Sequence, residues 1–229
     1  MQSPIVIAVD GPAGSGKSSV CRGVAQRLDL RYLDTGAMYR AMTLAVLRAG
    51  IDPRDAPGVC GLLPQVQLSI CTDPKAPAIA LNGDDVTAAV RGADVTAAVS
   101  AVSAVPEIRS AMVDAQRAEV AKAVFDNVGI VVEGRDIGSV VLPDASVKIF
   151  LTADPQIRAQ RRAAETDGAE VATTAALLQA RDAHDAGRQA SPMTQAPDAK
   201  VVDTSALSLS EVIDVVCAHV PALRTTNVE

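Results

Sequence analysis

Residues 5–18 read IVIAVDGPAGSGKS, and this stretch decides the fold. An apolar run is followed by the pattern G-x-x-x-x-G-K-[ST] over residues 11–18, and a helix-like stretch continues to about residue 28. Glycines let a loop wrap with its backbone N–H groups inward, and the helix that follows directs its positive end to the same point. In this pattern Lys17 reaches the β and γ phosphates of a nucleoside triphosphate and Ser18 offers its hydroxyl to Mg²⁺. The predicted cradle residues are Gly11, Pro12, Ala13, Gly14, Ser15, Gly16, Lys17, Ser18 and Ser19.

Four more short β-branched runs follow along the chain. Together with residues 5–9 they cover residues 31–33, 130–132, 147–151 and 200–202. Apolar runs that end directly in a polar residue are typical of buried parallel strands whose carboxyl ends face a site. Longer Ala- and Leu-rich stretches separate the runs, over residues 17–28, 36–49, 93–125, 154–164, 172–184 and 208–219. The alternation predicts an α/β fold, a three-layer core with a five-stranded parallel sheet between helices.

The gap between the second and third runs is too long for one crossover helix. Within it, residues 66–70 and 78–81 are β-prone and flank the turn-prone segment 73–77, and Asn82-Gly83 follows. Paired short strands around such turns are typical of antiparallel hairpins. The sequence therefore predicts a small antiparallel β insertion near residues 63–92.

Composition narrows the class of protein. The chain has 229 residues, with 21 Lys and Arg against 27 Asp and Glu, which gives a net charge of −6. An acidic balance argues against general binding to nucleic acid or to anionic membranes, and an aromatic content of 2% leaves no platform for stacking bases. The four cysteines lack the spacing of a metal site or a C-x-x-C pair. No targeting segment is visible, so we expect a cytoplasmic protein. The length suits one domain over residues 1–229. We expect a monomer, because no long apolar stripe is left without a sheet to cover.

Polar and cationic residues follow several of the predicted strands. Thr35 comes after the second strand and can N-cap the next helix, and Arg40 lies about one turn into that helix. Glu133-Gly134-Arg135-Asp136 follows the third strand. Because carboxyl ends of parallel strands meet at one edge of a sheet, Arg40 and Arg135 are expected beside the cradle. Helical spacing places two further sets on shared faces, namely Arg158, Arg161 and Arg162, and Arg181, Asp185 and Arg188.

The sequence lacks the signatures of other classes of protein that carry this glycine-rich cradle, the P-loop. A GTPase would carry an Asn-Lys-x-Asp guanine reader, and Asn-Lys occurs nowhere in the chain. An ABC-type ATPase would carry a Leu-Ser-Gly-Gly-type signature, and the chain has no Gly-Gly pair. Small kinases of nucleotide metabolism remain, which must bring two phosphate-bearing molecules together and therefore need cations from several segments.

At these residues the sequence resembles the bacterial cytidylate kinases, a family of P-loop nucleoside monophosphate kinases. The matching stretches are DGPAGSGKS at 10–18, LDTGAMYR at 33–40, EGRDIG at 133–138, PDASVKIF at 143–150, and Arg181-Asp182 with Asp185 and Arg188. The likeness runs from about residue 5 to residue 218. It implies a P-loop core, an acceptor-binding region that includes the β insertion, about residues 63–105, and a helical Arg-rich lid, about residues 155–188.

The resemblance also implies roles for individual residues. Contacts to the acceptor phosphate are expected from Thr35, Arg40, Arg135 and Arg188. The cytosine readers are expected to be Ser100, Arg109 and Asp136, and the ribose contacts Arg181 and Asp185. Catalytic cations are expected to be Lys17, Arg135, Arg158 and Arg188, and the metal contact Ser18. A carboxylate such as Asp136 can accept from the amino group of cytosine, a donor that uracil lacks.

The predicted activity is Mg²⁺-dependent transfer of the γ-phosphoryl group of ATP to CMP or dCMP. A small P-loop kinase for another acceptor, such as UMP or a carboxylated metabolite, is the nearest alternative. A nucleotide-gated protein that contacts nucleic acid through its Arg clusters is the alternative from another class, and the acidic composition and the scarcity of aromatic residues argue against it.

Overall fold

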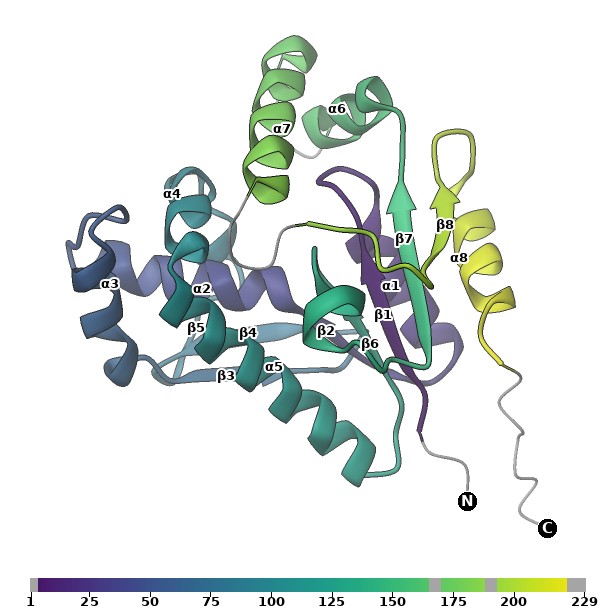
Figure 1. Ribbon diagram of the computed structural model, residues 1–229, viewed down its shortest axis with the longest axis horizontal. Coiled ribbons are helices and arrows are strands. Elements are labelled where there is room, and N and C mark those ends of the chain that lie inside the picture. Colours follow the sequence, from purple (N-terminus) through teal and green to yellow (C-terminus); the bar gives the residue numbers. More distant parts are fainter. Residues whose placement is uncertain (1–3, 165–169, 188–192, 222–229) are drawn as a thin grey trace.

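The computed structural model describes residues 4–164, 170–187 and 193–221. A five-stranded sheet with the order β2-β6-β1-β7-β8 forms its centre, and every neighbouring pair is parallel (Figure 1). The strands are β1 (Val6–Asp10), β2 (Arg31–Asp34), β6 (Ile130–Glu133), β7 (Val147–Thr152) and β8 (Lys200–Asp203). The predicted sheet and its five strands are confirmed.

Helices cover both faces of this sheet. On one face α1 (Lys17–Arg27) and α8 (Leu209–Ala218) pack together on Ile7, Val131 and Ile149. The opposite face carries α2 (Thr35–Arg48) and α5 (Pro106–Phe125), whose core includes Ala8 and Val132. Alternate residues of a strand point to opposite faces, so the continuous apolar strands can fill both cores.

The β insertion is confirmed and joins the core beside β2. It contains β3 (Leu68–Cys71), β4 (Ala78–Leu81) and β5 (Asp84–Asp85), which pair antiparallel. The turn before β5 uses Asn82 and Gly83, both with positive φ, as the Asn-Gly pair predicts. The backbone N–H of Tyr32 donates to the carbonyl of Thr72 at 2.9 Å, which ties the insertion to the first residues of β2.

One helix prediction needs correction, and one helix was not predicted. The expected helix over 93–125 is two helices, α4 (Ala93–Ala104) and α5, because Pro106 cannot donate and forces Val105 into an extended conformation with ψ 120°. A helix that the sequence did not indicate, α3 (Ala56–Leu62), begins with Pro57 in its first turn, where proline is well tolerated.

Two further helices lie beyond the carboxyl ends of β1 and β7 (Figure 1). These are α6 (Pro155–Ala164) and α7 (Val171–Ala186), which pack against each other. Short helical turns complete the described chain: η1 (Leu63–Gln65), η2 (Ala89–Arg91) and η3 (Ile137–Val141). In the described residues, no helix is long and apolar enough to cross a membrane.

Candidate active site

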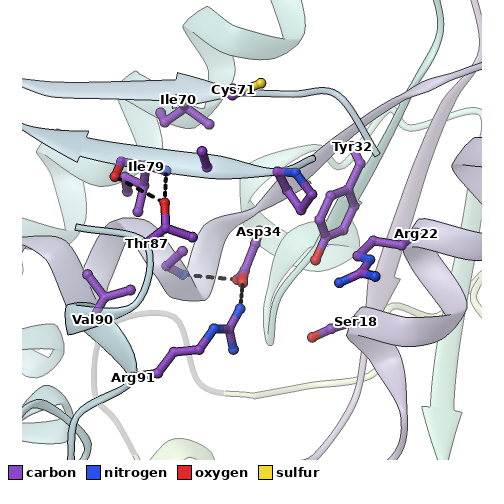
Figure 2. Close-up of a pocket in the computed structure, with 13 residues that line it drawn as sticks. Ser18, Arg22, Tyr32, Asp34, Ile70, Cys71, Ile79, Thr87, Val90 and Arg91 are labelled. Atoms are coloured by element: carbon purple, nitrogen blue, oxygen red, sulfur yellow. Dashed lines mark hydrogen bonds and ion pairs between the residues drawn. The ribbon is translucent and has the colours of Figure 1, made fainter. Parts of the chain in front are cut away.

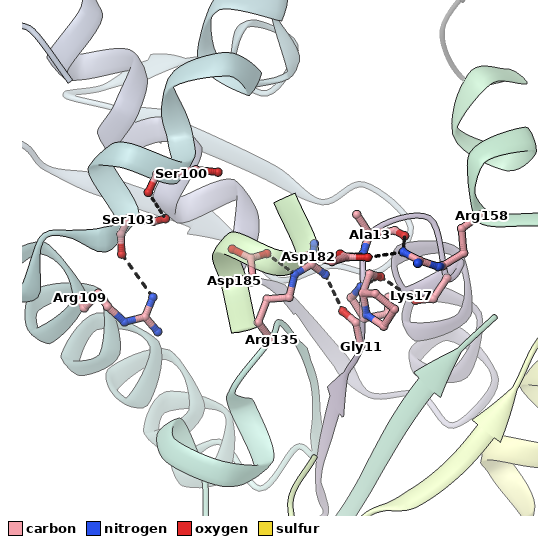
Figure 3. A network of polar contacts seen from close by, with 12 residues as sticks. Gly11, Ala13, Lys17, Ser100, Ser103, Arg109, Arg135, Arg158, Asp182 and Asp185 are labelled. Atoms are coloured by element: carbon pink, nitrogen blue, oxygen red, sulfur yellow. Dashed lines mark hydrogen bonds and ion pairs between the residues drawn. The ribbon is translucent and has the colours of Figure 1, made fainter. Parts of the chain in front are cut away.

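The glycine-rich cradle connects β1 to α1. Gly11, Gly14 and Gly16 have φ of 145°, 75° and 85°, which side chains other than glycine rarely adopt. The Lys17 ammonium donates to the carbonyl of Pro12 at 2.7 Å, and the Ser15 hydroxyl donates to the same carbonyl at 3.0 Å. The loop therefore holds the strand-to-helix turn that the sequence pattern predicts, with Lys17 folded over it (Figure 3).

The first glycine has no room for a side chain. A Cβ on Gly11 would lie 2.0 Å from the carbonyl oxygen of Leu151 in β7. Gly11→Ala should therefore lower the free energy of unfolding by about 3 kcal/mol or more, since it combines a steric overlap with a strained backbone. Gly61→Ala is the control, because a Cβ there meets nothing within 4 Å. Urea denaturation of both variants measures the difference, and equal stabilities would contradict this account of the cradle.

Lys17 is desolvated and lies near both a cation and several acidic groups. Burial, followed by the nearby Arg135 guanidinium, lowers the pKa of Lys17 to about 7. A bound polyphosphate would favour the charged ammonium and raise this pKa again. The cradle therefore has the electrostatic character of a site for a highly charged anion.

Glu133, at the end of β6, is a buried junction behind the cradle. Its Oε1 accepts from the Ser18 hydroxyl at 2.7 Å and from the Tyr32 hydroxyl at 2.9 Å. Within the described part of the chain, Oε2 is buried and has no hydrogen-bond partner. Burial, and then the charge of Asp34, raise the pKa of Glu133 to about 7. Neighbouring Tyr32 has its pKa raised by burial as well.

These groups fit a magnesium ion. Mg²⁺ usually takes one or two protein oxygens and completes its octahedron with waters and substrate phosphates. The Ser18 hydroxyl donates a hydrogen bond to Glu133, which leaves its own lone pairs for a cation. A cation there would favour the charged form of Glu133, whose Oε2 has no hydrogen-bond partner among the described residues. Among the described residues, no group of three or more His, Cys, Asp or Glu side chains could hold a metal ion, so a protein-only cage is not found there.

The acceptor side begins at the end of β2. The N-cap of α2 is Asp34, whose carboxylate accepts from the backbone N–H of Ala37 at 2.9 Å, so the expectation of a Thr35 cap is wrong. Thr35 is the first helical residue, and its hydroxyl donates instead to the Glu133 carbonyl at 2.6 Å. The backbone of Asp34 has the extended conformation of an N-cap, with φ −87° and ψ 95°, so its carboxylate reaches the free amides of the first turn. Thr35 therefore joins β2 to β6 at the site.

Several guanidinium groups converge opposite the cradle. Burial, and then the charges of Arg135 and Arg40, lower the pKa of Arg181 to about 10. Burial likewise lowers the pKa of Arg40, and the like charges of Arg135 and Arg162 also lower it. Cations that depress each other's pKa values lie close together, and such a cluster favours an anionic ligand. The structure thus brings together Arg40, Arg135 and Arg181 from three distant segments.

Arg135 contacts both halves of the site. Its Nη1 donates to the Gly11 carbonyl at 2.6 Å, and its Nε donates to Asp185 of α7 at 3.0 Å (Figure 3). Only 17% of its side chain is exposed, so these bonds form in a largely desolvated environment where they are strong. Arg135 therefore lies between the cradle and α7.

A second polar cluster lies between α4, α5 and the start of η3. Buried Arg109 forms an ion pair with buried Asp136, and its Nη1 donates to the Ser103 carbonyl at 3.4 Å. The Ser103 hydroxyl donates in turn to the Ser100 carbonyl at 3.2 Å (Figure 3). The guanidinium of Arg109 lies 5.5 Å from the ring centroid of Tyr39. The three predicted base readers are therefore neighbours.

Arg158 and Arg161 of α6 point to different partners. Arg158 donates to the Ala13 carbonyl at 3.1 Å and forms an ion pair with Asp182 of α7. Arg161 donates instead to the hydroxyl and carbonyl of Thr204, and the Thr204 hydroxyl donates to the Ser15 carbonyl, so Arg161 supports the cradle from behind. Predicted Arg188 lies outside the described residues.

A separate pocket of about 510 Å³, including its open mouth, lies between α1 and the β insertion (Figure 2). Ser18, Arg22 and Asp34 line its polar side, and Ile70 and Ile79 line its apolar side. Asp34 forms an ion pair with Arg91 across it at 3.5 Å. The pocket reaches the cradle only through Ser18, and it does not contain the converging arginines.

Sequence reasoning assigned no role to three carboxylates that the structure places at the site. Asp10 accepts backbone N–H groups beside Asp136, Glu133 holds Ser18, and Asp182 holds Arg158. The positions of Asp10 and Glu133 at strand ends were a signal that could have found them. Asp182 carried no such signal, because its contacts depend on how α7 packs.

Comparison with known proteins agrees with this arrangement. A family model described as cytidylate kinase matches residues 7–222. A cytidylate kinase of Streptomyces avermitilis is 49% identical over 223 residues, 97% of this chain and 95% of that protein. One of Nocardia farcinica is 52% identical over 216 residues, 93% of this chain and 91% of that protein. A solved gluconokinase from Sinorhizobium meliloti 1021, 15% identical, gives a TM-score of 0.50 over 96% of this chain and 93% of that one, a likeness of fold alone.

Proposed function

The chain belongs to the cytidylate kinase family, and we propose that it transfers the γ-phosphoryl group of ATP to CMP or dCMP, giving ADP and CDP or dCDP. The observation that carries this proposal is the place of Arg135, which donates to the Gly11 carbonyl of the cradle at 2.6 Å and to Asp185 of α7, the helix that also carries Arg181, at 3.0 Å. One cradle and one separate cationic cluster suit two phosphate-bearing substrates. A triphosphate and a monophosphate would otherwise repel each other.

The acceptor is proposed to extend from this cluster to Asp136. Thr35, Arg40 and Arg135, with Arg188, would hold its phosphate, and Arg181 with Asp185 its ribose. Ser100, Arg109 and Asp136 would read the cytosine, because a carboxylate accepts from the amino group and a guanidinium donates to the carbonyl. The Arg109–Asp136 pair supports this proposal, since each side chain orients the other where little water is present.

ATP is proposed to bind the cradle from Gly11 to Ser19. Ser18 would hold Mg²⁺, with the Glu133 carboxylate behind it. When bound, Mg²⁺ neutralises charge on the β and γ phosphates. Lys17 would turn from the Pro12 carbonyl to these phosphates, and Arg158 would reach them from α6, since it already contacts the Ala13 carbonyl.

In the proposed reaction an oxygen of the acceptor phosphate attacks the γ phosphorus, and the bond to the bridging oxygen of ADP breaks. The attacking oxygen is anionic near neutral pH, so no general base is needed. The residues act by alignment and by stabilising charge on the transferring group. Arg135 is well placed for this role, because it contacts the first cradle residue and the acceptor cluster together.

The proposal extends to the organisation of the enzyme. Residues 63–105 would form the acceptor-binding region and residues 155–188 the lid, within one domain over 1–229. A lid that closes over both substrates would exclude water and suppress hydrolysis of ATP. We propose a cytoplasmic monomer with small-molecule substrates and no nucleic-acid or membrane partner.

The experiment that tests this function is ADP release with CMP, dCMP, UMP or AMP, or with no acceptor. We expect kcat/KM for CMP or dCMP to exceed that for UMP and AMP by at least about 100-fold, because reading the amino group discriminates strongly. We also expect only slow release without an acceptor. Equal rates with all acceptors would overturn the proposal, and tight, salt-sensitive retention of RNA on a filter would favour a nucleic-acid-binding role instead.

A further inference from the structure

Asp10 is a buried carboxylate to which the mechanism above gives no part. It is the last residue of β1, next to Gly11, and only 3% of it is exposed. Its Oδ1 accepts from the backbone N–H of Ile137 and its Oδ2 from that of Gly138, each at 2.8 Å. A carboxylate that accepts two adjacent backbone N–H groups fixes both the position and the orientation of that peptide segment.

The two amides belong to the segment that carries the acceptor-binding side chains. Ile137 and Gly138 begin η3, directly after Arg135 and Asp136. The parallel ladder between β1 and β6 ends with Val9 opposite Glu133, and the Gly134 N–H donates to the Val9 carbonyl at 3.0 Å. Beyond that point the sheet no longer aligns the segment after β1 with the segment after β6. The Asp10 carboxylate continues the connection for two further amides.

The segment after β6 would otherwise have few backbone constraints. η3 is a π-helical turn, a rare conformation with weak intrinsic stability, and its first amides have no partners inside the turn. A Cβ on Gly138 would lie 3.2 Å from the Lys148 side chain and 3.5 Å from Asp10 Oδ2, so the turn is tightly packed against β1 and β7. The Asp10 side chain, from a distant part of the sequence, therefore accepts from the free amides at the start of this turn.

We propose that Asp10 is a positioning residue, which sets the distance and angle between the phosphate cradle and the acceptor-reading pair Arg135 and Asp136. The inference rests on the proposed function. Asp10 touches neither substrate in this proposal and acts through the backbone of residues 137–138. Because Asp10 adjoins Gly11 covalently, its carboxylate ties the backbone of residues 137–138 to the start of the cradle, and the bond from Arg135 to the Gly11 carbonyl adds a second tie beside it.

The charges around Asp10 agree with this role. Burial is the largest influence and raises the pKa of Asp10 to about 6, opposed by the hydrogen bonds from Gly138 and Ile137. The charge of Asp136 raises the pKa further and that of Lys17 lowers it. The two backbone N–H donors, one to each oxygen, favour the ionised carboxylate, in which both oxygens are acceptors.

The test uses Asp10→Ala and Asp10→Asn in the full chain. The alanine removes both acceptors, whereas asparagine keeps one acceptor and turns an N–H₂ donor toward the other amide. For Asp10→Ala we expect the KM for CMP to rise about 10- to 100-fold and the preference for CMP over UMP to fall at least about tenfold. The KM for ATP should change by less than about threefold, because the cradle is also held by the bonds from Ser15 to Pro12 and from Thr204 to Ser15. Asp10→Asn should show the same pattern more weakly.

Asp203→Asn is the matched control, since Asp203 also ends a strand and its carboxylate accepts from the Ser205 N–H at 2.8 Å, away from the acceptor segment. It should leave both KM values and the preference unchanged. A purely structural role for Asp10 would lower kcat for every acceptor alike and leave the KM for CMP and the preference as in the wild type, which would overturn the inference. If Asp10→Ala does not fold, Asp10→Asn decides by the same criteria. A wild-type enzyme without a preference for CMP would instead refute the proposed function.

Discussion

Replacing Arg135 with methionine should lower kcat for CMP by about a thousandfold or more, because a guanidinium on the transferring phosphoryl group is worth that much in related phosphoryl transfers. Methionine keeps much of the length and the apolar contacts and removes only the charge and the N–H donors. The bond to the Gly11 carbonyl is lost, and so is the ion pair with the mostly buried Asp185 carboxylate. Steady-state rates with saturating ATP and CMP measure the effect.

Arg135→Lys separates charge from geometry. Lysine keeps the positive charge but cannot reach the Gly11 carbonyl and Asp185 at once with a planar fork. We expect it to recover only a small part of the lost rate. Arg27→Met is the control, since Arg27 pairs with Asp214 on the exposed surface, and its kcat should match that of the wild type. If kcat for Arg135→Met is within about tenfold of the wild type, Arg135 does not stabilise the transferring phosphoryl group.

The core and the cradle could be predicted because their information is local. Residues 5–18 contain the strand, the glycines and the start of the helix in unbroken order, and each part restricts the next. The same holds for Arg135 and Asp136, which follow a clearly apolar strand. The break between α4 and α5 is also a local feature, because Pro106 alone interrupts the helix. The alanine-rich composition of 93–125 favours one continuous helix, and the proline overrides it.

The remaining parts of the site depend on packing between distant segments. Glu133 is recognisable as a buried junction only when it meets Tyr32 and Ser18, which are 101 and 115 residues away in the chain. Asp182 lies on a helix whose polar residues are typical of a solvated face, and only the packing of α7 on α6 brings it to Arg158. Helical spacing likewise could not reveal that Arg161 turns to Thr204.

Asp136→Asn should remove most of the preference for CMP over UMP. The amide of asparagine presents an N–H₂ donor where the carboxylate accepted, so it repels the amino group of cytosine and can donate to the O4 of uracil. We expect kcat/KM for CMP to fall by about 100-fold or more and the ratio of CMP to UMP to fall by a similar factor. Competition between the two acceptors in one reaction measures that ratio directly.

The same substitution breaks the buried pair with Arg109, so stability must be measured beside selectivity. Removing one partner of a buried ion pair costs about 3–5 kcal/mol, because the other charge remains desolvated. Asp136→Asn, which still offers an oxygen to Arg109, should cost less than Asp136→Ala. Asp126→Asn is the control, since its pair with Arg31 lies near the surface and should contribute under about 1 kcal/mol. A variant that loses stability but keeps the full preference for CMP would show that Asp136 only holds Arg109, and that the cytosine is read by other groups.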